Sequence, residues 1–158
     1  MSVTSNTYFV AHSLGCITTL RYLQTVAAPI GGVVLVSGFD QPIPDFSFLD
    51  EFTATPPNYK LLSRTIPNRA VVSAIDDPIV PHEFSRSFAE RFDAVFYETK
   101  TGRHYLDVDG VTTLPIVARC TVSHDGIVAN RIPCPMKQKR DSKRQSDEWN
   151  LFVIAQVI

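Results

Sequence analysis

Residues 7–15 of this 158-residue chain read Thr7-Tyr-Phe-Val-Ala-His-Ser-Leu-Gly15 and predict a strand that turns directly into a helix. The first residues are mostly β-branched or aromatic, which favours an extended strand. Residues 16–26 carry apolar side chains at roughly helical spacing, and Pro29 follows them, so we expect a helix that ends before this proline. Ser13 is therefore expected on a tight turn between the two elements.

The chain continues with the same alternation of strand and helix. Residues 33–36 form a continuous apolar run, of the kind that is buried on both faces of a parallel sheet. Residues 70–74 and 94–97 predict two more strands, and residues 82–91 predict a helix that begins after Pro81. This order of elements predicts an α/β fold with a mostly parallel sheet.

The composition excludes several classes of protein. With 15 Lys and Arg against 16 Asp and Glu the formal net charge is −1, so we expect no nucleic-acid partner and no binding to an anionic membrane surface. No stretch has the length and apolarity of a membrane span or a secretion signal. The three cysteines, which lack C-x-x-C spacing, fit reduced thiols. We therefore expect a cytoplasmic protein.

Residues 11–15 form the first chemical motif. They match the G-x-S-x-G pattern with Ala11 in the first place, at the kind of strand-to-helix turn where that pattern occurs. Ala11 and Gly15 are small, as the sharp turn requires. Ser13 is thus a candidate nucleophile, and the backbone N–H of Leu14, at the helix N-terminus, is the candidate oxyanion donor. Such a pentapeptide also arises by chance, so its interpretation depends on whether the chain also supplies a base and an acid.

A serine nucleophile needs both of these groups, and candidates for each lie later in the sequence. Asp76 and Asp77 come directly after the strand at residues 70–74, at the sheet edge where sites assemble. We favour Asp77, which stands in Asp-x-x-Val-Pro, over the alternative Asp76, whose side chain could equally serve to cap the turn. His104 follows the last clear strand and is favoured as the base. The other histidines are expected to face solvent, and the one beside Ser13 to point away from it: His12, His82 and His124.

Three stretches share the order and spacing of a known family: Phe9-Val-Ala-His-Ser-Leu-Gly-Cys, Ser73-Ala-Ile-Asp-Asp-Pro-Ile-Val-Pro and Gly102-Arg-His-Tyr. Asp109-Gly and Leu114-Pro follow them. With these motifs the chain resembles the small serine hydrolases related to retinoblastoma-binding protein nine, over about residues 7–117. The resemblance implies the α/β-hydrolase fold, a three-layer α/β/α sandwich.

The same resemblance implies a chemistry. Ser13 would attack an ester or acyl substrate, His104 would act as general base, and Asp77 would orient His104. A small ester or acyl substrate is the expected partner, and no cofactor or metal is implied. The segment at residues 39–67 would line the pocket with aromatic residues and without a distinctive polar group, which favours an apolar acyl or aryl group: Phe46, Phe48, Phe52 and Tyr59.

The beginning of the chain departs from the family. Members have a strand, a His-Gly-type oxyanion loop and further elements before the nucleophile, so we expect an N-terminally truncated fold that lacks its first strands. Without that loop the second oxyanion N–H is missing, and the activity is expected to be weak or absent. The alternative function is a non-catalytic remnant of the fold or a protein-interaction module. The strand at residues 7–11 would have an unpaired edge that self-association can cover. Arg103 replaces the family's usual glycine and is expected to crowd the approach to His104.

The end of the chain departs as well. Residues 119–158 lack the amphipathic helix that closes the family's fold, so we assign the partial hydrolase domain to residues 1–118 and predict a divergent, poorly ordered tail after it. We interpret the tail as a misread gene end; a basic cluster within residues 137–144 gives a nuclear-localisation or anionic-partner segment as the alternative. Three metal-capable residues lack the spacing of a zinc finger, so no metal is expected there: Cys120, His124 and Cys134.

Overall fold

The structure is a computed structural model that describes residues 3–117 and 150–156. Its strands and helices alternate along the chain, as the sequence predicts. In chain order the elements are β1 (Thr7–Ser13), α1 (Gly15–Val26), β2 (Gly32–Val36), η1 (Ser47–Leu49), α2 (Asp50–Thr53), α3 (Tyr59–Thr65), β3 (Asn68–Ala74), α4 (His82–Phe92), β4 (Val95–Thr99), η2 (Asp107–Asp109) and β5 (Asn150–Gln156).

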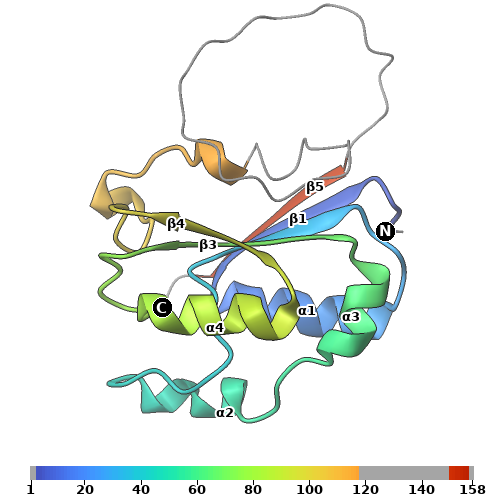
Figure 1. Ribbon diagram of the computed structural model, residues 1–158, viewed down its shortest axis with the longest axis horizontal. Coiled ribbons are helices and arrows are strands. Elements are labelled where there is room, and N and C mark those ends of the chain that lie inside the picture. Colours follow the sequence, from blue (N-terminus) through green and yellow to red (C-terminus); the bar gives the residue numbers. More distant parts are fainter. Residues whose placement is uncertain (1–2, 118–149, 157–158) are drawn as a thin grey trace, which may run out of the picture.

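The strands form one five-stranded sheet in the order β4-β3-β2-β1-β5, seen nearly edge-on in Figure 1. Every neighbouring pair runs parallel. The carboxyl ends of all strands therefore meet at one edge, where residues that follow different strands become neighbours. The expected α/β fold with a mostly parallel sheet is confirmed.

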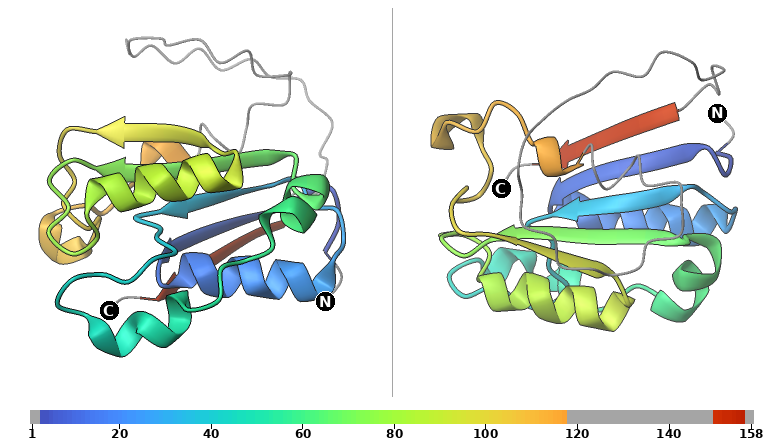
Figure 2. Two further views of the ribbon diagram at one scale, coloured as in Figure 1. Left: turned by 60° about the horizontal axis from the view of Figure 1, so that its bottom comes forward. Right: turned by 45° about the horizontal axis from the view of Figure 1, so that its top comes forward.

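The helices α1, α3 and α4 cover one face of the sheet (Figure 2). The sheet residues on this face alternate with residues that point the other way, as a pleated strand requires. In β2, for example, Val33 and Leu35 pack with the helices, whereas Val34 and Val36 join the cluster on the opposite face. On that opposite face the described residues include Tyr105, Leu114 and Ile116, which pack against the sheet in the place of a third layer.

No helix in the described part of the chain has the length and apolarity needed to cross a membrane.

The strand β5 comes from the segment that the sequence assigns to the tail. It pairs with β1 over the whole length of that strand, from Thr7 beside Asn150 to Ser13 beside Gln156. In Figure 1 β5 (red) lies alongside β1 (blue). The sequence analysis assigns residues 150–156 to a divergent, poorly ordered tail, whereas the structure describes them as a strand of the sheet.

The pairing with β5 also changes the expectation for the edge of β1. This strand has a neighbour on each side, β2 and β5, so its backbone N–H and C=O groups have partners within the chain. The predicted unpaired edge is wrong, and the physical reason to expect self-association through β1 disappears with it. The basic cluster within residues 137–144 and the residues Cys120, His124 and Cys134 lie outside the described residues.

Candidate active site

Ser13 lies at the carboxyl end of β1 with a φ of 53°, in the left-handed region that residues with a side chain rarely adopt. The residues two positions before and after Ser13 are small and buried: Ala11 in β1 and Gly15, which begins α1. The chain can reverse sharply at Ser13 because neither of these two positions carries a bulky side chain. A strained backbone at a polar residue is a common feature of functional sites.

The hydroxyl of Ser13 meets the ring of His104, which lies 91 positions later in the chain. Ser13 Oγ is 3.0 Å from His104 Nε2. Both residues are buried, with 0% of Ser13 and 1% of His104 exposed. The hydroxyl can therefore donate its proton to Nε2 with little competition from water.

The other ring nitrogen of His104 faces Asp77. His104 Nδ1 is 2.9 Å from Oδ2 and 3.1 Å from Oδ1 of this carboxylate. The backbone N–H groups of Ile79 and Val80 donate to Oδ1 at 2.9 and 3.0 Å, and the Ser37 hydroxyl donates to Oδ2 at 2.8 Å. These donors hold the carboxylate in one orientation toward His104.

The hydrogen bonds also keep Asp77 ionised. Burial by itself raises the pKa of Asp77, but the hydrogen bonds from His104 and from the N–H groups of Ile79 and Val80 outweigh it. The net pKa of Asp77 therefore lies below its usual value. The carboxylate is charged at neutral pH and fixes the proton of His104 on Nδ1, which leaves Nε2 free to accept.

The structure separates the two neighbouring aspartates. Asp76 is exposed and accepts the backbone N–H of Arg103 at 2.8 Å, while Asp77 reaches His104. The guanidinium of Arg103 pairs with Asp109 at 2.9 Å. Asp109 also accepts the backbone N–H of His104 at 3.2 Å. The two carboxylates, Asp76 and Asp109, therefore hold the loop that carries the histidine.

Leu14 provides the nearest backbone donor to Ser13. It is the N-cap residue of α1, and its N–H points to no acceptor within residues 3–117 and 150–156. The N-terminus of a helix favours a negative charge because its first N–H groups have no partners within the helix. This position suits an oxyanion that forms on a substrate bound to Ser13.

An apolar cluster surrounds the side chain of Leu14. Four of its members come from the segment after β2, namely Phe39, Ile43, Phe46 and Leu49, and three come after β3, namely Ile79, Val80 and Phe84. Of the aromatic residues expected to line a pocket, Phe46 contacts this cluster, whereas Phe48 and Phe52 are exposed. Tyr59 belongs elsewhere, because its ring lies against Phe88 and Phe92.

The segment after β2 does carry a distinctive polar group, contrary to expectation. Asp40 has a side chain that is only 1% exposed, and it pairs with Arg91 of α4. The Tyr59 hydroxyl donates to the same carboxylate at 2.6 Å. These bonds tie the segment to α3 and α4, so Asp40 anchors a segment whose apolar residues pack around Leu14.

The sequence analysis did not identify Ser37 as part of the site, and it placed His12 in solvent. Ser37 directly follows β2, at the sheet edge that Asp77 also reaches, and that position was the one available signal. His12 was expected to point into solvent, but it is half-buried, and its Nε2 lies 2.8 Å from the carbonyl oxygen of His104. Nothing in the local sequence distinguishes it from a solvated histidine.

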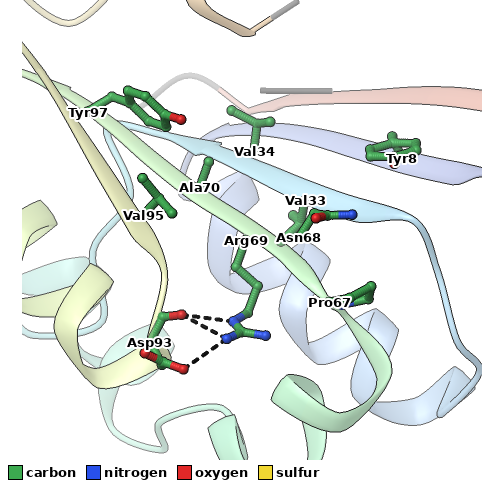
Figure 3. A pocket seen from close by; sticks show the side chains of 10 residues that line it. All are labelled: Tyr8, Val33, Val34, Pro67, Asn68, Arg69, Ala70, Asp93, Val95 and Tyr97. Carbon is green, nitrogen blue, oxygen red and sulfur yellow. Dashed lines mark hydrogen bonds and ion pairs between the residues drawn. The ribbon is translucent and has the colours of Figure 1, made fainter. Parts of the chain in front are cut away.

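A cavity of about 240 Å³ lies at the other end of the sheet. Figure 3 shows its lining, which includes Tyr8 and Val33 near the starts of their strands and Asn68 and Arg69 at the start of β3. The guanidinium of Arg69 is already paired with Asp93 at 3.0 Å. Because Ser13 ends β1 and these residues begin their strands, this cavity does not serve the serine.

Known proteins are similar to this chain in sequence and in fold. The family model described as Serine hydrolase matches residues 1–122. The putative hydrolase YdeN of Bacillus subtilis (strain 168) is 44% identical over 114 residues, which make up 71% of this chain and 60% of that protein. The crystal structure of the ydeN gene product from B. subtilis matches with a TM-score of 0.71 and 43% identity, over 74% of this chain and 64% of that chain.

The chain thus spans less than two thirds of the length of these two relatives. The family model extends from the first residue past His104 and so includes every residue of the site. On this match the chain belongs to the serine hydrolase family.

Proposed function

We propose that this chain hydrolyses ester or acyl bonds, with Ser13 as the nucleophile. One observation carries the proposal: the hydrogen-bonded chain from Ser13 Oγ through both ring nitrogens of His104 to the carboxylate of Asp77, with links of 3.0 and 2.9 Å. Nucleophile, base and orienting acid in this order are the arrangement that acyl transfer to water needs. Membership in the serine hydrolase family supports the same reaction class.

The first half of the reaction forms an acyl-enzyme. Ser13 Oγ attacks the substrate carbonyl carbon while His104 Nε2 takes the hydroxyl proton. The negative charge of Asp77 stabilises the imidazolium that results. His104 then gives this proton to the leaving alcohol or amine as the tetrahedral intermediate collapses.

The second half releases the acid product. Water attacks the acyl carbon, His104 Nε2 takes a proton from that water, and the same proton returns to Ser13 Oγ. The steps use the substrate, water and groups of the chain itself.

The backbone N–H of Leu14 would stabilise the oxyanion of both tetrahedral intermediates. It is the one oxyanion donor that we assign among the described residues, and the loss of one such donor lowers kcat by about 10²–10³. The apolar cluster around Leu14 favours a substrate with an apolar acyl or aryl group.

We place the protein in the cytoplasm on the basis of its composition.

A second candidate function has one observation in its favour. Ser13 is 0% exposed, so a substrate reaches its hydroxyl only after the residues around it move. A chain that never opens in this way would be a non-catalytic form of the fold or an interaction module. The two functions differ in whether Ser13 reacts with a small electrophile.

Labelling with a fluorophosphonate probe tests the proposal, because such probes react with an activated serine. We expect the protein to label at Ser13 and to hydrolyse p-nitrophenyl acetate, and Ser13→Ala to lose both activities. Ser47→Ala, at an exposed serine, is the matched control and is expected to behave as the unchanged protein. A cooperatively folded protein that neither labels at Ser13 nor hydrolyses the ester would refute the enzyme and favour the non-catalytic alternative.

A further inference from the structure

His12 precedes Ser13 at the end of β1, and the proposed reaction assigns it no role. Its ring nevertheless contacts the histidine of the site. His12 Nε2 is 2.8 Å from the carbonyl oxygen of His104, and the two ring centroids are 4.7 Å apart. Two consecutive residues therefore hold His104: Ser13 contacts its ring, and His12 contacts its backbone.

This double contact depends on the backbone of Ser13. Consecutive side chains of a regular strand point to opposite faces of the sheet, so His12 and Ser13 would normally face different neighbours. The left-handed conformation of Ser13, with a φ of 53°, ends that alternation. The same turn that presents the hydroxyl thus lets the side chain before it reach the same partner.

The direction of the hydrogen bond is fixed by its acceptor. A carbonyl oxygen only accepts, so His12 must carry a hydrogen on Nε2 and donate it. Burial lowers the pKa of His12, and repulsion from His104 adds to this effect; together they outweigh the bond to the carbonyl and the attraction of Asp77. His12 is therefore a neutral donor at neutral pH and does not oppose the positive charge that His104 acquires.

The backbone around His104 needs such support. It belongs to no helix or strand, and its neighbours Arg103 and Tyr105 both have left-handed φ values, of 47° and 56°. Its N–H donates to Asp109 at 3.2 Å, and its carbonyl accepts from His12. Side chains therefore hold the backbone of His104 at both its N–H and its carbonyl, in a loop that has no helical or strand hydrogen bonds to hold it.

We propose that His12 is a positioning residue, whose Nε2–H holds the backbone of His104 so that the His104 ring stays within hydrogen-bonding reach of Ser13. This inference rests on the proposed function. His12 acts through His104 and contacts no substrate, so its loss is expected to slow the chemical step without weakening substrate binding.

Three substitutions separate the donor from the bulk of the side chain. His12→Gln places an amide N–H near the position of Nε2, and His12→Met has a similar length without a donor. His12→Asn keeps the amide but is one methylene shorter, and it serves if the methionine variant does not fold. The rate of fluorophosphonate labelling at Ser13, together with kcat and KM for p-nitrophenyl acetate, is measured for each variant beside a thermal melt.

We expect His12→Met and His12→Asn to label Ser13 about fivefold to tenfold more slowly, the factor typical of one hydrogen bond. Their kcat is expected to fall while KM changes by less than about twofold. His12→Gln is expected to recover most of the lost rate, which a role in packing alone would not produce. Folded methionine and asparagine variants that label at the unchanged rate, or a glutamine variant as slow as both, would overturn the role of His12. An unchanged protein that never labels at Ser13 would instead overturn the proposed function and this inference with it.

Discussion

Replacement of Asp77 by asparagine is expected to lower kcat/KM by about 10⁴, because the new amide reverses the tautomer of His104. The amide has two possible orientations. Oδ1 of Asp77 accepts the N–H groups of Ile79 and Val80, so the amide oxygen of the variant must occupy that place to keep both bonds. The NH₂ group then lies where Oδ2 was, 2.9 Å from His104 Nδ1.

This orientation places the proton on the wrong nitrogen. The NH₂ group donates to His104 Nδ1, so the ring carries its own hydrogen on Nε2 and cannot accept the proton of Ser13. The Ser37 hydroxyl adapts without loss, because it can rotate and accept from the amide. Nothing in the surroundings of residue 77 therefore favours the productive orientation.

The magnitude is set by the bonds involved. Reversal of the amide to the productive orientation breaks the two backbone bonds to Ile79 and Val80, at a cost of about 3 kcal/mol. Loss of the carboxylate charge removes a charge-assisted bond to the imidazolium, for about 2–3 kcal/mol more. The sum of about 5–6 kcal/mol corresponds to a factor of roughly 10⁴ at 1.36 kcal/mol for each tenfold change.

The assay compares kcat/KM for p-nitrophenyl acetate between Asp77→Asn and Asp76→Asn. Asp76 accepts only the N–H of Arg103, and an amide oxygen can accept the same bond, so this control is expected to stay within about threefold of the unchanged protein. A loss of less than about 30-fold in Asp77→Asn would refute the tautomer argument. So would an equal loss in both variants, because the assignment of the acid to Asp77 would then fail.

Two further changes test the surroundings of the site. Ser37→Ala removes the hydroxyl that donates to Asp77 Oδ2 at 2.8 Å, so we expect kcat/KM to fall about threefold to tenfold and the pKa of Asp77 to rise, measured by esterase kinetics and by NMR titration of the carboxyl; unchanged values of both would show that the bond does not matter. Deletion of residues 150–158 removes β5 and leaves β1 with an unpaired edge, so we expect the melting temperature to fall by about 10 °C or more and size-exclusion chromatography to show larger species. A monomer with an unchanged melt would contradict the pairing of β5 with β1.

The sequence predicts the parts of this molecule that depend on local pattern. The turn at Ser13 is predicted by small residues beside a serine, between a β-branched run and a helical run. The neighbourhood of Ser13, Asp77 and His104 was expected because each follows or ends a strand, and parallel strands end at one edge. These expectations need only the order of elements and the direction of strands.

The strand β5 could not be predicted from the sequence, for a physical reason. A short apolar run after a long polar stretch shows that a segment can be extended, but not which strand it pairs with. The pairing with β1 places it beside a strand 143 positions away in the chain, counting from Thr7 to Asn150. Contacts of such long range leave no periodic pattern in either segment.

His12 and Ser37 were missed for a different reason. Each makes one hydrogen bond whose existence depends on the path of a loop, in the first case the loop at His104 and in the second the loop at Asp77. The sequence does not show whether a polar residue at a strand end faces solvent or a buried partner. To tell the two cases apart one must know that Ser13 and Arg103 have left-handed backbone conformations. Residues other than glycine give no sequence signal for such a conformation.

The site takes one polar side chain from the end of each of four neighbouring strands. Ser13 ends β1, Ser37 directly follows β2, Asp77 follows β3, and His104 follows β4. The hydrogen bonds among them run from Ser13 to His104, then to Asp77 and on to Ser37. Ser13 ends β1 and His104 follows β4, and these two strands lie at opposite sides of the group of four. The loop after β4, rather than the spacing of the strands, therefore brings His104 to within 3.0 Å of Ser13.

Several residues at these strand ends and in the loop after β4 have a strained backbone. Ser13, Ser37, Arg103 and Tyr105 all have positive φ, and each such residue costs about 1–3 kcal/mol relative to an ordinary conformation. The buried sheet beneath supplies the packing that maintains them, since β2 is buried along its whole length and β1 pairs on both sides. A perturbation that loosens the sheet, such as the loss of β5, should thus relax the strained turns first. For that reason the geometry of Ser13 and His104 is expected to respond to the pairing of β1 before the fold as a whole is lost.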